Sequence, residues 1–203
     1  MILRNQHDVL ANVDGVYCDA ISSARISSIC FRKIIPRISF DYGSLAYTFF
    51  HQVNRYKVPI YLIGSSKQKI EIAAKNIKEQ FLHINIVGVH HGFISDGQTE
   101  QVATEIVASG AQFVLIGMGT PKQENMAKEI IQCAEGQQKT IHCFTCGGFL
   151  TQASQKLAYY PKWINRYHLR WAWRMFHEKH VIGRLLKEYP QFLYYFLKDR
   201  FMG

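Results

Sequence analysis

The sequence predicts an α/β fold: a Rossmann-like, mostly parallel sheet with helices on both faces, and a helical, basic and aromatic C-terminal extension. Short apolar runs alternate with segments of helical spacing along residues 1–160, as expected for parallel strands joined by crossover helices. Over residues 161–203, aromatic and basic residues recur at helical spacing and no further run resembles a strand. We therefore expect a core and an extension that divide near residue 160.

Length and composition fit one globular domain, because the chain has 203 residues of which 48% are hydrophobic, enough to bury a sizeable core. Its five cysteines are an odd number, and with no export signal they argue against a disulfide framework. The N-terminal residues lack the pattern of a signal peptide, and no uncharged apolar run reaches the roughly 18 residues of a membrane-spanning helix. The sequence therefore predicts a cytoplasmic protein.

Five apolar runs are the predicted strands, each followed by a segment with helical spacing. In chain order they are Asp8–Val13, Pro59–Ile63, Ile84–Val89, Phe113–Ile116 and Thr140–Phe144. Ligands of an open parallel sheet bind beyond the carboxyl ends of its strands. Candidate site residues should therefore directly follow the runs, at Asp14, Gly64–Ser66, His90–Gly92, Gly117–Glu124 and Gly147–Thr151.

The turn after the fourth run carries the strongest signal. Gly117 and Gly119 allow the backbone to approach a ligand closely, and Pro121 suits the first turn of a helix because its missing N–H would have no partner there. The N–H groups of such a turn attract anions. One cation and two groups with directional hydrogen bonds follow, namely Lys122, Gln123 and Glu124. This segment predicts a diphosphate or sugar site.

The Gly-x-Gly-x-Pro-Lys-Gln-Glu motif at residues 117–124 resembles the central motif of the WecG/TagA/CpsF family. These bacterial glycosyltransferases make enterobacterial common antigen, teichoic acid linkage units and capsular or exopolysaccharides. Softer matches occur at Asp14-Gly15, at His91-Gly92, at Gly147-Gly148 and at Pro161-Lys162-Trp163. The resemblance extends from about residue 8 to the C-terminus.

The resemblance implies an inverting, metal-independent glycosyltransferase that needs no cofactor. Its donor would be a UDP-sugar carrying ManNAc, ManNAcA or a glucose-like sugar. Its acceptor would be a polyprenyl-diphosphate-linked saccharide in cell-surface polysaccharide biosynthesis. The family's aspartate at the position of Asp14 is the proposed general base for the acceptor hydroxyl. From the residues alone, Asp14 also fits a helix cap.

Arg37 matches a family arginine that would stabilise charge on the leaving diphosphate, although Phe40 replaces a family glycine nearby. The alternative for Arg37 is a solvated surface charge. The chain contains no Asp-x-Asp, the common metal-binding device of nucleotide-sugar transferases. The leaving group would then be met by Arg37, Lys122 and helix N-termini.

The predicted substrate-binding set combines the strand ends with the family motifs, and comprises Asn12, Gly64, Ser65, His91, Gly117, Gly119, Pro121, Lys122, Gln123, Glu124, Gly147 and Gly148. The turn at residues 64–66 also fits an ordinary helix N-cap. The histidine pair at residues 90–91, and Cys143 with Cys146, lack further metal ligands at matching spacing. We therefore expect no metal site.

Several positions depart from the family pattern. Thr151 stands where aspartate is usual, Tyr159 where arginine is usual, and Arg170 where glutamate is usual. Only thirteen residues precede Asp14, where family members usually have a further βα unit. Two expectations stay open: an enzyme with a different donor or acceptor preference, or a catalytically impaired or truncated homologue that acts as a membrane or binding module.

Basic charge is concentrated in the C-terminal extension. Residues 160–203 contain nine Lys/Arg and three Asp/Glu, a net charge of +6 out of +9 for the chain. Aromatic residues interleave with these cations, which suits the headgroup zone of a bilayer. The same composition could bind RNA, dock on the core or form a homo-oligomer contact. Because the family's acceptors are membrane-bound, we expect peripheral association with the inner face of the cell membrane and no nucleic-acid partner.

The alternation of strands and helices is also typical of dinucleotide-dependent oxidoreductases, which form the alternative hypothesis. Such enzymes carry Gly-x-Gly-x-x-Gly after the first strand of the sheet. No such motif follows the first predicted strand, so the glycosyltransferase is the primary hypothesis.

Overall fold

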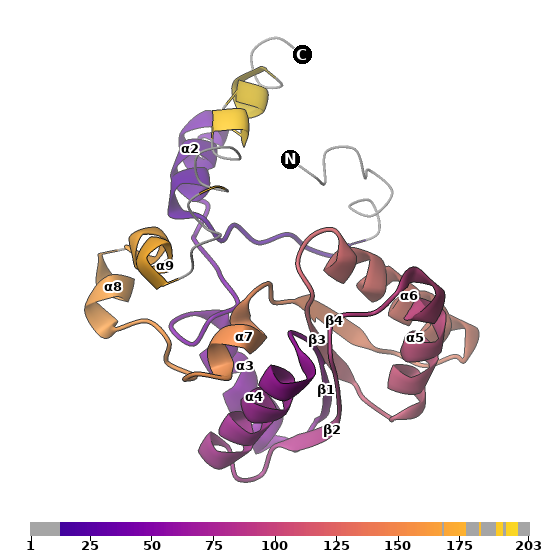
Figure 1. The fold of residues 1–203 in the computed structure, drawn as a ribbon. Helices are drawn as coiled ribbons and strands as arrows, with labels where there is room; N and C mark the ends of the chain where they lie inside the picture. Colours follow the sequence, from indigo (N-terminus) through magenta and orange to yellow (C-terminus); the bar gives the residue numbers. More distant parts are fainter. Residues whose placement is uncertain (1–12, 168, 178–182, 184–189, 193, 199–203) are drawn as a thin grey trace.

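A sheet of four parallel strands with helices on both faces forms the core (Figure 1). The structure is a computed structural model that describes residues 13–167, 169–177, 183, 190–192 and 194–198. The strands lie in the spatial order β2-β1-β3-β4. They are β1 (Pro59–Gly64), β2 (Asn85–His90), β3 (Phe113–Gly117) and β4 (His142–Thr145). This architecture confirms the predicted fold class.

Four of the five predicted strands correspond to these strands, and the bounds of β1, β2 and β3 differ from the prediction by one residue at most. The last strand begins two residues later than predicted, at His142. Ile141 is already buried, but pairing with β3 starts only at His142. The first predicted strand, at residues 8–13, lies outside the described residues except for Val13, which is not in a strand.

The two faces of the sheet are packed by alternate residues of the same strands. Leu62 and Leu115 belong to one core cluster, and Ile63 and Ile116 belong to the other, because successive side chains of a strand point to opposite faces. Burial on both faces explains why β1 and β3 are continuous apolar runs rather than alternating ones.

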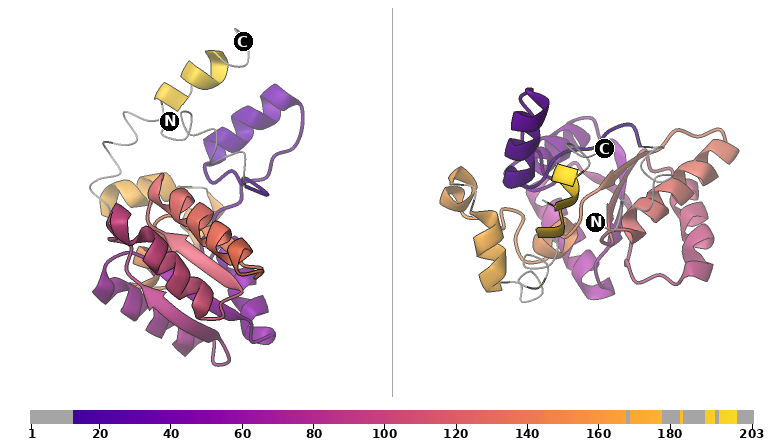
Figure 2. Two further views of the ribbon diagram at one scale, coloured as in Figure 1. Left: turned by 90° about the vertical axis from the view of Figure 1, so that its right-hand side faces the viewer. Right: turned by 90° about the horizontal axis from the view of Figure 1, so that it is seen from above.

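Five helices cover these faces (Figure 2). The first cluster receives side chains from α3 (Leu45–Arg55), α4 (Lys67–Gln80) and α7 (Phe149–Ala153). The second cluster receives them from α5 (Thr99–Ala108) and α6 (Lys122–Gly136), and a short 3₁₀ helix, η2 (Asp96–Gln98), precedes α5. Each crossover between parallel strands therefore contributes to the core.

Helices α2 (Ile21–Phe31), α8 (Lys162–Arg166) and α9 (Arg170–His177) lie outside this layered core, and residues 190–192 and 194–198 are also helical. Helix α2 projects away from the sheet, and the chain leaves and rejoins the core at a parallel bridge between Cys18 and Arg37 (Figures 1 and 2). The described residues after 161 contain helices and no strand, as predicted. The division near residue 160 stays a prediction. Within the described ranges, no helix has the length and apolar content needed to cross a bilayer.

A row of glycines lines the carboxyl edge of the sheet. A Cβ atom at Gly64 would lie 2.4 Å from the Gly117 carbonyl oxygen, and one at Gly117 would lie 2.9 Å from the Gly147 carbonyl oxygen. A Cβ atom at Gly92 would lie 2.9 Å from the Cα atom of Gly64. Gly64 also has a φ of 149°, in a region that side-chain-bearing residues rarely adopt. The turns after all four strands therefore pack backbone against backbone.

Replacing Gly64 by alanine should destabilise the fold, because the new methyl group would overlap the Gly117 carbonyl and the φ angle would be strained. We expect Gly64→Ala to lower the free energy of unfolding by at least about 2 kcal/mol. Thermal unfolding followed by circular dichroism should show this as a fall in Tm of about 4 °C or more.

Gly136→Ala is the matched control, because a Cβ atom at the end of α6 would meet nothing within 4 Å. Its Tm should stay within about 2 °C of the parent. Equal Tm values for the two variants would contradict the close packing of the glycine row.

Candidate active site

The glycine row leads into the turn that begins α6. Gly119 has a φ of 77°, and α6 starts at Lys122 with Pro121 at the N-cap, one residue earlier than the expected first turn. The Gln123 N–H donates to the Gly119 carbonyl at 3.0 Å, which closes the turn. Lys122 is exposed at the N-terminus of this helix, where its charge adds to the positive end of the helix dipole. The turn therefore has the charge that an anion requires.

Three side chains of this turn form a polar cluster. Thr120 Oγ1 donates to Glu124 Oε1 at 3.1 Å, and Gln123 Nε2 donates to the same oxygen at 2.8 Å. Gln123 is buried and Glu124 is half-buried. These bonds occupy one oxygen of Glu124 and the amide nitrogen of Gln123. They fix both side chains and leave the amide oxygen of Gln123, Oε1, and the second carboxylate oxygen of Glu124, Oε2, to another partner.

Three buried polar atoms at this edge have no hydrogen-bond partner among the described residues: Gln123 Oε1, Glu124 Oε2 and His91 Nδ1. The turn that carries His91 lies against the turn that leads into α6. A Cβ atom added at Gly92, next to His91, would lie only 3.1 Å from Met118 Cγ in that second turn. Buried polar atoms in native proteins are almost always satisfied. The arrangement therefore indicates a ligand, and the two oxygen acceptors suit the hydroxyl groups of a sugar.

Tyr17 joins the N-terminal segment to the same edge. Its hydroxyl donates to the Thr145 carbonyl at the end of β4. Burial, and to a smaller degree the neighbouring Cys146, Asp19 and Glu124, raise the pKa of Tyr17 to about 12. The hydroxyl therefore stays protonated at neutral pH and remains a donor. Sequence reasoning missed Tyr17, because a tyrosine between two predicted elements carries no signal of a distant partner.

Asp14 lies three residues before Tyr17 and is exposed. The two Cα atoms are separated by at most about 11 Å, the length of three extended residues. Asp14 caps no described helix, since α2 begins at Ile21 with Ala20 at its N-cap. Its role as a base stays a prediction. Asn12 lies outside the described residues.

Arg37 takes part in an ion-pair network around the buried Asp41. Its Nη2 atom lies 2.9 Å from Asp19 Oδ1 and 3.4 Å from Asp41 Oδ2. Arg170 donates to the same oxygen of Asp41, and its Nε donates to Asn165 Oδ1 at 2.6 Å. Burial and the charge of Arg37 lower the pKa of Arg170 to about 10, which leaves it charged at neutral pH. Arg37 is therefore not a solvated surface charge, and its contact with a diphosphate stays a prediction.

The turn after β1 is linked to α7 through Thr151. Ser65 Oγ lies 2.9 Å from Thr151 Oγ1. The N-cap of α4 is Ser66, and the N-cap of α7 is Gly148, which follows Gly147 with its φ of 53°. A threonine at position 151 satisfies the Ser65 hydroxyl without adding the negative charge of the aspartate that is usual there.

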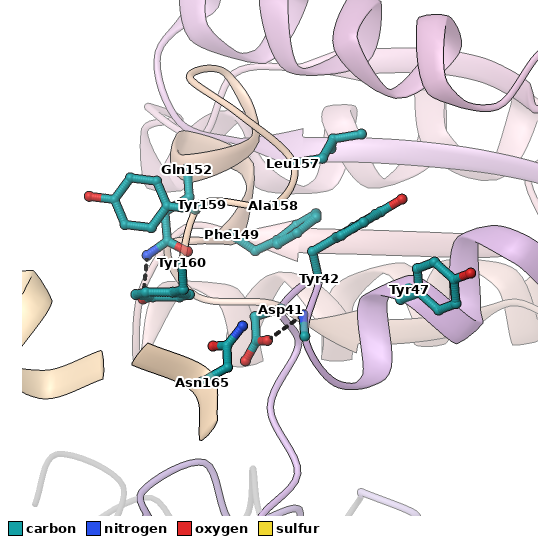
Figure 3. A pocket seen from close by; sticks show the side chains of 11 residues that line it. Asp41, Tyr42, Tyr47, Phe149, Gln152, Leu157, Ala158, Tyr159, Tyr160 and Asn165 are labelled. Atoms are coloured by element: carbon teal, nitrogen blue, oxygen red, sulfur yellow. Dashed lines mark hydrogen bonds between the residues drawn. The ribbon is translucent and has the colours of Figure 1, made fainter. Parts of the chain in front are cut away.

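An aromatic pocket of about 290 Å³ lies between the start of α3, helix α7 and the residues that lead to α8 (Figure 3). Gln152 Nε2 donates to the Tyr160 hydroxyl at 3.1 Å within it. Asp41 lines the pocket and also belongs to the ion-pair network. Five aromatic residues line it: Tyr42, Tyr47, Phe149, Tyr159 and Tyr160. This pocket had no counterpart in the predicted site.

Comparison with known proteins assigns the family. The family model described as "Glycosyl transferase WecG/TagA/CpsF family" matches residues 3–203. The UDP-Gal:alpha-D-GlcNAc-diphosphoundecaprenol beta-1,4-galactosyltransferase of Shigella boydii is 34% identical over 197 residues, which cover 97% of this chain and 81% of that protein. The chain is thus a glycosyltransferase and belongs to the WecG/TagA/CpsF family.

Proposed function

We propose that this protein transfers a sugar from a UDP-sugar to a polyprenyl-diphosphate-linked saccharide in cell-surface polysaccharide biosynthesis. The observation that carries the proposal is one helix N-terminus that combines the cation Lys122 with the unpartnered oxygens of Gln123 and Glu124. A UDP-sugar presents an anionic diphosphate next to sugar hydroxyls, so this turn suits both parts of the donor. The name of the Shigella boydii relative includes a donor and an acceptor of these classes.

UDP-galactose is the first donor to consider, because the relative's name specifies it. The family resemblance adds UDP-sugars with ManNAc, ManNAcA or glucose. These sugars differ in the orientation or substitution of a few ring positions. The oxygens of Gln123 and Glu124 and the ring nitrogen of His91 are the polar groups that would distinguish them.

In the proposed mechanism, Asp14 accepts the proton of the acceptor hydroxyl as that oxygen attacks the anomeric carbon of the donor. The bond from this carbon to the diphosphate breaks, UDP leaves, and the configuration is inverted. Lys122 and the N-terminus of α6 stabilise the charge that develops on the leaving group. Arg37 would join them by exchanging Asp19, its exposed partner, for the diphosphate. These positive groups perform the task without a metal ion.

The aromatic pocket is the proposed site of the acceptor saccharide. Ring faces such as those of Tyr47 and Tyr159 pack well against the C–H faces of a sugar. Gln152 and Asn165 place polar groups in the same pocket, as binding sites that orient a ligand usually do. The acceptor would then lie next to the ion-pair network that holds Arg37.

We also propose that the C-terminal extension contacts the inner surface of the cell membrane. Trp163, Tyr167, Trp171 and Phe176 are exposed on or next to α8 and α9. Exposed aromatic rings among basic residues suit the headgroup zone of an anionic bilayer. This contact would bring the active site to a lipid-linked acceptor.

Transfer of radiolabelled sugar tests the function. Purified protein is incubated with each UDP-sugar and a prenyl-diphosphate-GlcNAc acceptor, with and without EDTA. We expect a product with at least one donor, at a rate that EDTA leaves unchanged. Failure of every donor would favour the non-catalytic binding module, and a strict need for added Mg²⁺ or Mn²⁺ would contradict the metal-free mechanism.

Asp14→Asn should keep UDP binding and lose turnover, because the amide cannot accept the proton. We expect a fall of about 100-fold to 10,000-fold in kcat, with an unchanged Kd for UDP by calorimetry. Glu79→Gln, which neutralises an exposed carboxylate on α4, is the control and should keep parental kcat. A kcat of Asp14→Asn within about threefold of the parent would be far smaller than the loss of a general base and would remove Asp14 from the mechanism.

Lys122→Ala should weaken UDP binding, because it removes the cation at the N-terminus of α6. We expect a rise of about tenfold or more in Kd by calorimetry, as for a lost charged hydrogen bond. Lys128→Ala is the matched control, since Lys128 is exposed farther along the same helix. Equal Kd values for the two variants would place the diphosphate elsewhere.

A further inference from the structure

Helix α2 and the turn after it carry an exposed surface that the transfer reaction does not use. Among the 11 residues of α2, only Ala24 is buried. Ile29 is 78% exposed, Phe31 is 59% exposed, and Ile34 in the following turn is 91% exposed. Large apolar side chains gathered on one projecting element mark an interaction surface.

The same surface is basic. Arg25 and Ile29 are exposed four residues apart on one face of α2. Arg32 and Lys33 are exposed at its end. No Asp or Glu occurs between residues 20 and 40. A surface that presents cations next to apolar side chains fits an anionic phospholipid bilayer, in which the cations meet headgroups and the apolar groups enter the interface.

Ser28 holds the exposed turn in place. The Ile35 N–H donates to Ser28 Oγ at 3.0 Å, and the Lys33 N–H donates to the Ser28 carbonyl at 3.2 Å. Arg32 between them adopts the left-handed conformation, with a φ of 50°. These bonds fix the backbone of the turn, whose exposed residues Arg32, Lys33 and Ile34 we call the tip of α2.

This tip adjoins the C-terminal extension. The Phe31 and Phe196 rings meet edge to face, with their centroids 6.3 Å apart, and α2 lies beside the C-terminal segment in Figure 1. Tyr194 and Leu197 of that segment are exposed. The apolar surface of α2 is thus continuous with the part of the chain proposed above to contact the membrane.

We propose that α2 and its turn form a second membrane-binding element, which docks on an anionic phospholipid surface beside the C-terminal extension. The proposal rests on the proposed function, because a lipid-linked acceptor requires the enzyme to work at a bilayer. It adds a contact from the opposite end of the chain. The bridge between Cys18 and Arg37 connects this contact to the segment that carries Tyr17 and to the Arg37 ion pairs.

Co-sedimentation with vesicles of equal parts phosphatidylglycerol and phosphatidylcholine tests the proposal with the full chain. One variant, Ile29→Ser with Ile34→Ser, removes apolar groups and keeps the Phe31 contact. A second, Arg32→Gln with Lys33→Gln, removes charge. The matched control, Ile72→Ser with Leu82→Ser, removes two exposed apolar groups on and just after α4. Circular dichroism should give all four proteins the same Tm within about 2 °C.

We expect both α2 variants to lower the vesicle partition coefficient at least about fivefold, and the control to stay within about twofold of the parent. Added salt should weaken binding of the parent. A parent that stays in the supernatant, or α2 variants that bind like the parent, would overturn the proposal. So would light scattering that shows a dimeric parent and monomeric α2 variants with unchanged vesicle binding, because the surface would then join two copies.

Transfer to a short-chain, water-soluble acceptor separates this proposal from the proposed function. The α2 variants should transfer sugar to it at the parental rate, since the substituted side chains lie outside the candidate active site. A parent without transfer activity would contradict the proposed function and leave the vesicle result standing.

Discussion

The close approach of four backbone turns at the carboxyl edge of the sheet is the constraint on which the rest of the structure depends. Gly64, Gly92 and Gly117 leave no room for side chains between these turns, and Gly117 packs against the Gly147 carbonyl. The surface at this edge of the sheet is therefore formed by backbone atoms. Side chains that could recognise a ligand must come from the residues after these glycines. This is why the polar groups of the candidate site are concentrated at the start of α6 and in the turn after β2.

The ion-pair network gives a structural role to Arg170, one of the positions at which this sequence departs from the family pattern. Arg170, where glutamate is usual, shares Asp41 with Arg37 and so joins α9 to the segment before α3. Burying these charges carries a desolvation cost that only good pairing offsets. Arg170 also lies over the Tyr160 ring, 5.1 Å from its centroid. The substitution therefore supplies an interaction that holds the extension on the core, rather than only removing an acid.

Local patterns predicted the sheet and the α6 turn, because a buried parallel strand such as β3 and a glycine-proline turn depend on neighbouring residues. The Asp41–Arg170 ion pair and the Tyr17 contact each join residues more than a hundred positions apart, and the aromatic pocket is assembled from segments that only the tertiary fold brings together. A segment with helical spacing was predicted after residues 8–13, and α2 lies there, but its projection from the core was not predicted, since only Ala24 of this helix is buried. Asp14 was a candidate because it follows the first predicted strand, but its role as a base comes from the family resemblance and stays a prediction.

The bridge between Cys18 and Arg37 makes α2 an excursion that is closed at its base, where the Ile38 N–H donates to the Cys18 carbonyl at 3.0 Å. The entropy of closing a loop rises slowly with loop length. The segment between Cys18 and Arg37 can therefore be shortened, lengthened or replaced without altering the order or register of the strands. Such an excursion is a suitable graft point for engineering, because a fluorophore or an affinity tag placed there leaves the donor turn untouched.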